Sequence, residues 1–430
     1  MKLYRLFFFL ILFMYQNDSF SYPKINTIKS NSDYLLITEN SLPIIDIGIN
    51  FSIGSTDDKG MYGLTNLAFE SLSRIKYGDE KVIDLFESMG AEFSYDVGKD
   101  FSTMKVRFIN NKENIHNVTT LLNFIFRNRQ ISENDLEFLK EKIKNRINSQ
   151  LLNPGSLARI KANEKFFIGT DYSHPIVGHK KSIALLTTAN VVGHLDKIFT
   201  KKSIGINLVG NISENESAHI IHKMLNNVSK GTGKIKEKSK IKFNGKMYLQ
   251  KISMSSKQTH IYIVIPAVSR VDKDYYNLLI ANYIFGGSGF GSKLFNEIRQ
   301  KRGLAYSVYS YLRPYNDFGL LIINMQTENK NAKSAINILK NEIYKIKKDI
   351  FTKQEIENAK EGILGDFYIR YDTNKKMLNL LTQINYLNFE IDYFKNYENE
   401  IKKVTKEKIH DAIQKYIFLE KSIITTVGNF

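Results

Sequence analysis

Three side chains on one short predicted helix have the spacing of a metal-hydrolase site but not its chemistry. In GLTNLAFESL, Asn66 and Glu70 are four residues apart, and Phe69 precedes Glu70. Residues one helical turn apart share a face, so two histidines at this spacing can hold one Zn²⁺ while an adjacent acid takes a proton from bound water. An amide, a phenyl ring and one carboxylate supply neither the ligand set nor the base. We therefore predict no working zinc site at these positions.

No other set of residues offers an obvious alternative centre. His219 and His222 are three residues apart on a predicted helix, but no third ligand stands at a recognisable spacing, and a surface helix explains them better. The chain has no cysteine, which excludes thiol catalysis, disulfides and cysteine metal sites. The glycine-rich GGSGFGSK (Gly286–Lys293) follows a predicted helix, and Ser292 stands where a Walker lysine is needed, so a close-packed connection is favoured over a phosphate site.

The elements that must position these residues indicate an α+β fold. Strand-like runs such as STMKVRFI and YSVYSYL occur in adjacent pairs, whereas helical runs such as Gly63–Arg74, Glu133–Leu152 and Ser292–Arg302 follow one another. Paired strands and runs of helices favour sandwiches of an antiparallel or mixed sheet flanked by helices over a doubly wound parallel sheet. Ser132 followed by Asp135 predicts the N-terminal cap of the long helix.

An internal repeat divides the chain. KKSIGINLVGNI (Lys201–Ile212) is echoed by EKSIITTVGNF (Glu420–Phe430), and several preceding helices repeat in the same order at an offset of roughly 220 residues. A polar, lysine-rich segment lies between the repeats. We expect two homologous domains, 22–228 and 247–430, joined by a linker at 229–246.

The composition and the N-terminal segment indicate where the protein is located and which partners it could have. The 430 residues carry a net charge of +17, but most lysines alternate with acidic residues or asparagine, and the pattern does not favour nucleic-acid binding. Residues 1–21 have a basic start, an apolar core (Leu6–Tyr15) and small residues before Tyr22, which predicts a cleaved signal peptide. We therefore expect a periplasmic or otherwise exported protein, associated with a membrane only if this segment stays uncleaved.

The first half resembles a known family despite its altered helix. FSIGSTDDKGMYGLTNLAFESL, followed by DLFESMGAEFS, is similar to the insulinase/pitrilysin metallopeptidases, which include mitochondrial processing peptidase. Active members carry H-x-x-E-H on this helix. The resemblance places the first histidine at Asn66, the glutamate at Phe69, the second histidine at Glu70, and a third ligand, a later glutamate, near Asn148. It implies a clam-shell half made of two similar domains.

The second half keeps a different family signature. SKLFNEIRQKRGLAYSVYSYL resembles the R-x-x-x-G/Q-L-x-Y motif of the family's C-terminal domain, and the match falls on Arg299 and Tyr306. In the family this pair contacts the substrate peptide across the cleft from the zinc helix. A guanidinium and a phenol are suitable donors for a peptide carbonyl or its oxyanion.

The resemblance implies a subunit that is inactive alone and active only within a heteromeric zinc peptidase. Zinc is expected in a sister subunit and no cofactor in this chain, which would contribute Arg299 and Tyr306 to peptide hydrolysis. The partner is either such a sister or a second copy of this chain. Two alternatives remain open: a structural or peptide-binding scaffold with no role in proteolysis, and a self-sufficient zinc peptidase.

Overall fold

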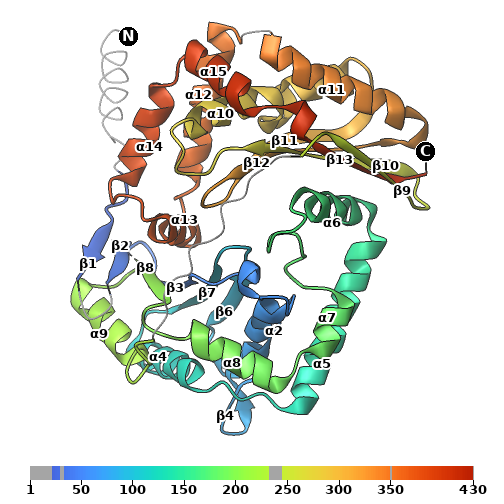
Figure 1. Cartoon of the computed structure of the whole chain (residues 1–430). Helices are drawn as coiled ribbons and strands as arrows, with labels where there is room; N and C mark the ends of the chain where they lie inside the picture. Colours follow the sequence, from blue (N-terminus) through green and yellow to red (C-terminus); the bar gives the residue numbers. More distant parts are fainter. Residues whose placement is uncertain (1–21, 30–32, 232–244, 349–350, 430) are drawn as a thin grey trace, which may run out of the picture.

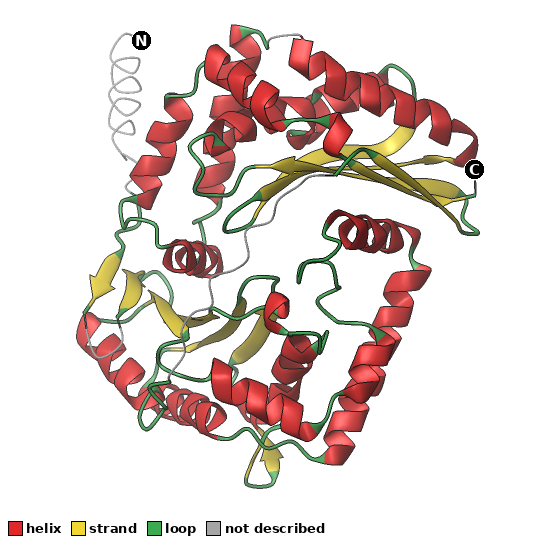
Figure 2. Ribbon diagram, in the orientation of Figure 1, coloured by secondary structure: helices red, strands yellow, loops and turns green. Residues whose placement is uncertain are grey.

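The computed structural model describes residues 22–29, 33–231, 245–348 and 351–429 and arranges them around two β-sheets (Figure 1). The predicted signal peptide and residues 232–244 of the predicted linker lie outside the described residues. Helices flank both sheets, so the expected α+β class is confirmed (Figure 2). None of the helices in the described ranges combines the length and the apolar character needed to cross a bilayer.

The first sheet has the strand order β1-β2-β8-β3-β7-β6. Strands β2 and β8 run parallel, and β3 is antiparallel to both of its neighbours, β8 and β7. A separate small hairpin is formed by β4 (Lys76–Tyr77) and β5 (Glu80–Lys81). The six strands of the sheet are β1 (Asn26–Ile28), β2 (Tyr34–Thr38), β3 (Ile44–Phe51), β6 (Glu92–Val97), β7 (Ser102–Ile109) and β8 (Ile204–Gly210).

The second sheet repeats this arrangement. Its order is β11-β12-β10-β13-β9, and the terminal pair β13 and β9 is again parallel while the other pairs are antiparallel. Read from β9, the order corresponds strand by strand to β2-β8-β3-β7-β6. A duplicated unit would have this topology, and duplication remains our interpretation of it. The strands are β9 (Tyr248–Ser253), β10 (Gln258–Ala267), β11 (Ala305–Pro314), β12 (Gly319–Glu328) and β13 (Ile423–Gly428).

Polar side chains cap the start of several helices, among them α4, α5 and α6. Ser132 accepts a hydrogen bond from the Asp135 amide (3.1 Å), so the predicted cap of α5 is confirmed. The helices of the first half are α2 (Leu64–Ser71), α3 (Val82–Ser88), α4 (Lys112–Arg127), α5 (Glu133–Leu152), α6 (Pro154–Phe166), α7 (Lys180–Leu185), α8 (Thr188–Ile198) and α9 (Glu214–Met224). Those of the second half are α10 (Tyr275–Asn282), α11 (Ala332–Lys348), α12 (Lys353–Ile369), α13 (Asn374–Leu387), α14 (Tyr393–Lys402) and α15 (Lys406–Tyr416).

The two halves exchange one helix each. Helix α6 of the first half packs against β10 and β13, and α13 of the second half packs against β3 and β8 (Figure 1). The second contact includes a hydrogen bond from the Asn50 side chain to the Thr382 carbonyl (2.8 Å). A Cβ at Gly205 would stand 2.3 Å from the Asn385 side chain, so α13 and β8 approach closely here and a larger residue would require Asn385 to move. These exchanged helices fix the halves relative to each other.

Candidate functional site

Helix α2 carries the residues that the family motif places around zinc, and a buried aspartate holds its first turn. The Asp58 carboxylate accepts hydrogen bonds from the Gly63 amide (2.7 Å), the Thr65 amide (2.8 Å) and the Thr65 hydroxyl (2.6 Å). These bonds satisfy amides that a helix start leaves without intrahelical partners. Burial nevertheless raises the pKa of Asp58 to about 6. All eight residues of α2 are buried, so the helix has no open face.

Two of the motif positions are filled by side chains that cannot serve a metal. Phe69 is fully buried and packs edge-on against Phe51, with the ring centroids 5.3 Å apart; it also lies beside Tyr95. Asn66 is buried as well, and its amide nitrogen has no hydrogen-bond partner among the described residues. In the register that the resemblance implies, a hydrocarbon ring stands at the position of the general base, and the amide at Asn66 is a poor zinc donor.

Glu70, at the third motif position, is already neutralised by protein cations. Its carboxylate pairs with Arg146 and with Lys142 (3.2 Å), both on α5. Burial alone would raise the pKa of Glu70, but the Arg146 hydrogen bond and the two positive charges outweigh it and lower the pKa below its usual value. Tyr95 also hydrogen-bonds with Glu70, and its pKa is raised by burial and by the Glu70 charge. Positive charge from two side chains therefore stands where a divalent ion would have to bind.

The helix from which the resemblance expects the third ligand supplies two cations instead. We expected the counterpart of that ligand near Asn148, which lies half-buried on α5. Within the described residues, however, the α5 side chains that bond to Glu70 are Lys142 and Arg146 rather than Asn148. The described ranges also contain no cluster of three or more His, Cys, Asp or Glu residues that could hold a metal ion. Lys142 and Arg146 are four residues apart and so share one face of α5, but no feature of the sequence indicates that this face meets Glu70.

Arg299 and Tyr306 are brought together by the structure. Arg299 lies half-buried on a π-helical turn (Phe295–Gln300), within the predicted helix Ser292–Arg302. Its guanidinium carbon is 4.8 Å from the ring centroid of Tyr306, 4.9 Å from that of Phe295 and 5.8 Å from that of Phe290. Rings hold a guanidinium by its face and leave its N–H donors, at the edge, available for a carbonyl or carboxylate.

A β-bulge displays Tyr306 at an edge of the second sheet. Ala305 pairs with Thr327 and Ser307 with Gln326, so Tyr306 is the extra residue between consecutive pairs. Its side chain is 74% exposed. Strand β11 is also the terminal strand of its sheet, and within the described residues only β12 pairs with it. Bulges commonly re-aim a side chain beside a functional site, and an unpaired edge can accept an extended peptide.

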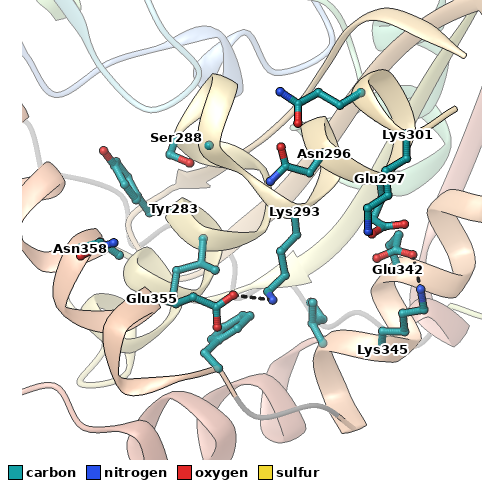
Figure 3. Close-up of a pocket in the computed structure, with 16 residues that line it drawn as sticks. Tyr283, Ser288, Lys293, Asn296, Glu297, Lys301, Glu342, Lys345, Glu355 and Asn358 are labelled. Atoms are coloured by element: carbon teal, nitrogen blue, oxygen red, sulfur yellow. Dashed lines mark hydrogen bonds and ion pairs between the residues drawn. The ribbon is translucent and has the colours of Figure 1, made fainter. Parts of the chain in front are cut away.

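The glycine-rich segment Gly286–Lys293 lines one wall of a large cavity on the helical side of the second sheet. The cavity has a volume of about 900 Å³ and lies between the π-helical turns and helices α11 and α12 (Figure 3). Lys293 donates to Glu355 (2.7 Å) and Lys345 to Glu342 (2.7 Å), so charges on its wall are paired with each other. A Cβ at Gly286 would lie 2.4 Å from the Ser310 hydroxyl, which supports the close-packed connection predicted for this segment.

His194 adds a titratable group beneath α2. Its Nε2 atom lies 2.9 Å from the Thr65 hydroxyl, and the side chain is buried. Burial, with smaller contributions from Lys197 and Lys59, lowers the pKa of His194 to about 4. The two histidines on α9, His219 and His222, are exposed, as the surface-helix interpretation predicts.

We expect His194 to make the protein sensitive to acid. Between pH 6.5 and about 4 the unfolded state binds a proton at this histidine that the folded state does not, so stability falls as the pH falls. The free energy of unfolding of the wild-type protein, measured relative to that of His194→Asn, should drop by about 3 kcal/mol as the pH falls through this window. Urea denaturation at each pH measures it. The raised pKa of Asp58 makes the folded state more stable as the pH falls below 6. This effect is the same in the wild type and in His194→Asn, so it largely cancels in the comparison. If the free energies of unfolding of the two proteins change in parallel with pH, His194 does not titrate as described.

Comparison with known proteins places this arrangement in a family. Residues 186–363 match the family model described as "Peptidase M16 inactive domain". The "Non-peptidase homolog YmxG" of Helicobacter pylori (strain ATCC 700392 / 26695) is 25% identical over 387 residues, 87% of each chain. The crystal structure of a peptidase M16 inactive domain from Pseudomonas fluorescens has a TM-score of 0.88 at 24% identity and covers 94% of this chain and 98% of that one.

A more distant structural neighbour is a chain of complex III2 from Candida albicans, with a TM-score of 0.76, 15% identity, and coverage of 95% of this chain and 96% of that one. These neighbours share the fold of this chain. The resemblance to the insulinase and pitrilysin peptidases is therefore confirmed. The segment that matches the family model, residues 186–363, does not include Glu70. Residues 186–363 match the inactive-domain model of peptidase M16, and the chain as a whole has the fold of the solved M16 structure from Pseudomonas fluorescens.

Proposed function

We propose that this chain is the non-catalytic subunit of an exported zinc peptidase and contributes Arg299 and Tyr306 to the active site of a zinc-bearing sister subunit. The main support for this proposal is a contrast between two sites. The place for the metal is closed by Glu70 and its cations, whereas Arg299 and Tyr306 lie together beside an exposed sheet edge.

The chemistry of the pair suits a supporting role in peptide hydrolysis. As water attacks a peptide carbonyl, negative charge develops on its oxygen, and prepositioned N–H and O–H donors stabilise that charge. The guanidinium of Arg299, held by the surrounding rings, and the hydroxyl of Tyr306 are such donors. The sister would supply the zinc, and the free edge of β11 offers main-chain groups to an extended peptide.

Export is part of this proposal. It is supported by the basic start and apolar core of residues 1–21 and by the lack of cysteine, which leaves the chain indifferent to an oxidising compartment. The sister would then be exported as well.

The proposal is tested by assembling the subunit with a candidate sister, an M16 chain from the same organism that carries an intact H-x-x-E-H. We expect the two chains to co-purify and to cleave unfolded peptides together. If the sister alone is as active as the mixture, or if the chains do not associate, the proposed role is wrong.

The chain alone should be indifferent to metal removal. A bound ion would stabilise the folded state and raise Tm, so stripping it with a chelator would lower Tm. Because Phe69 and the cation-paired Glu70 leave no ligand set on α2, we expect EDTA to leave the Tm of the isolated chain unchanged. Differential scanning calorimetry with and without EDTA, together with metal analysis, checks this. Stoichiometric zinc with chelator-sensitive cleavage would instead establish a self-sufficient peptidase.

A scaffold without any role in proteolysis is the second candidate. It is favoured by the shared fold with a chain of complex III2 from Candida albicans. In that case Arg299 and Tyr306 would be inherited residues without a substrate, and their replacement would change no turnover.

A further inference from the structure

A small cavity at the junction of the two halves carries an unusual set of charges. It has a volume of about 90 Å³ and lies where α6 and the loop after it meet β11 and the turn between β6 and β7. Lys99 comes from that turn, Arg159 from α6 and Arg313 from β11. None of the residues that line the cavity is acidic.

The three cations are incompletely neutralised by the protein. Among the described residues, neither Arg159 nor Arg313 forms an ion pair with a carboxylate. The guanidinium carbon of Arg313 lies 5.5 Å from the ring centroid of Tyr315. The Lys99 ammonium donates to the His174 carbonyl. Burial lowers the pKa of Lys99 to about 7, a shift opposed by the charges of Asp58 and Asp100 and increased by Arg313. An anion in the cavity would relieve this crowding of positive charge.

The remaining walls favour a ligand that is part charged and part apolar. The side-chain oxygen of Asn163 is buried in the wall without a hydrogen-bond partner. Turning this amide over would present its NH₂ group, a donor, at the same place. Phe167, Tyr172 and Tyr315 supply aromatic surface, and the Tyr172 hydroxyl is held by Asp100. Cations, an amide and rings together form a built site rather than a patch of surface lysines.

We propose that this cavity binds a carboxylate of a peptide, and that its preferred source is a free C-terminus. This inference rests on the proposed function only in taking a peptide as the ligand. A cavity of about 90 Å³ has room for a small group such as a carboxylate but not for a long side chain as well. Arg159 and Arg313 can each donate paired N–H bonds to its oxygens.

A second cavity gives room for the rest of the peptide. It has a volume of about 490 Å³ and shares Gln150, Ile160, Pro175 and Val177 with the cationic cavity. Its lining includes Ile147 and Leu151, which offer apolar contact to side chains upstream of the terminus. The peptide would therefore lie along α5 and α6 with its last residue at the junction of the halves.

The test is direct binding to the isolated full chain, without a sister subunit and without cleavage. The probe is the peptide Ala-Ala-Ala-Phe, labelled with fluorescein at its N-terminus, in three forms: the free acid, the C-terminal amide, and an amide in which the third residue is glutamate. Fluorescence anisotropy gives Kd. We expect the free acid to bind about tenfold or more tightly than the amide, the size of one charge-assisted hydrogen bond. The preference should weaken as salt is raised.

Two variants and one matched control locate the effect. Arg159→Gln and Arg313→Gln should each abolish most of the preference for the free acid. The control is Arg302→Gln. It removes an arginine that pairs with Glu297 and does not line the cavity, so this variant should keep the preference for the free acid. Circular dichroism checks that each variant folds.

The outcomes are distinct. If the wild-type chain binds acid and amide equally, or binds neither, the proposal is wrong, whatever the variants do. If the glutamate-containing amide matches the free acid, the site takes side-chain carboxylates and the C-terminal preference is wrong. A failure of cleavage by the assembled pair would leave this binding result unaffected, so the two proposals fail separately.

Discussion

Replacing Arg299 by alanine is expected to lower the kcat of the assembled peptidase by about a hundredfold while changing KM little. The reason is that a donor aimed at the developing oxyanion acts mainly in the transition state. The Tyr306→Phe variant keeps the ring that stacks on Arg299 and removes only the hydroxyl, so we expect a smaller loss, about tenfold. Steady-state kinetics with a fluorogenic peptide measure both.

Matched controls separate this effect from local unfolding. Arg302→Ala removes a nearby arginine that pairs with Glu297 (2.7 Å), and Tyr309→Phe removes a hydroxyl from the same strand as Tyr306. Both should leave kcat close to the wild-type value. If Arg299→Ala and Tyr306→Phe behave like these controls in a pair that still assembles, the shared active site is disproved and the scaffold interpretation stands.

The fold was largely predictable because its signals are local. The strand STMKVRFI coincides with β7, and the Ser132 cap starts α5 where its spacing predicts. The exchange of α6 and α13 was not predictable, because it depends on packing between segments more than a hundred residues apart. The π-helical turn at Phe295–Gln300 was predicted as an ordinary helix, since the extra residue in such a turn leaves no clear mark in hydrophobic periodicity.

The residues of the candidate site were proposed from the sequence, but their environment could not be predicted from it. The family motif proposed Asn66, Phe69 and Glu70 as the positions of a zinc site, and the structure shows that the helix that carries them is buried on all sides. It did not identify Arg146, because a salt bridge between residues 76 positions apart has no sequence signature. The same limit applies to the cationic cavity, whose arginines come from opposite halves of the chain. The bulge at Tyr306 likewise depends on pairing with β12 and cannot be read from one strand.

A large loss of stability at pH 7 is expected from breaking the buried ion pair of Glu70. Arg146→Met removes the main partner of Glu70 and leaves a carboxylate that is 4% exposed facing Lys142 alone. Breaking one side of a buried pair usually costs about 3–5 kcal/mol. Because Lys142 remains and Arg146 is itself one-third exposed, we expect about 2 kcal/mol at pH 7, measured by urea denaturation.

The double variant tests whether the cost comes from the uncompensated charge. Glu70→Gln in the Arg146→Met background removes that charge and keeps an amide that can bond to Tyr95, so it should restore about half of the lost stability or more. Lys144→Met, two residues away on α5, breaks only a surface pair with Glu141 and should cost less than about 0.5 kcal/mol. If Arg146→Met behaves like Lys144→Met, the buried pair does not stabilise the fold. If instead the coupling is found, the cations on α5 have taken over the structural part of a metal ion's role, holding α2 against α5 without providing a hydrolytic centre.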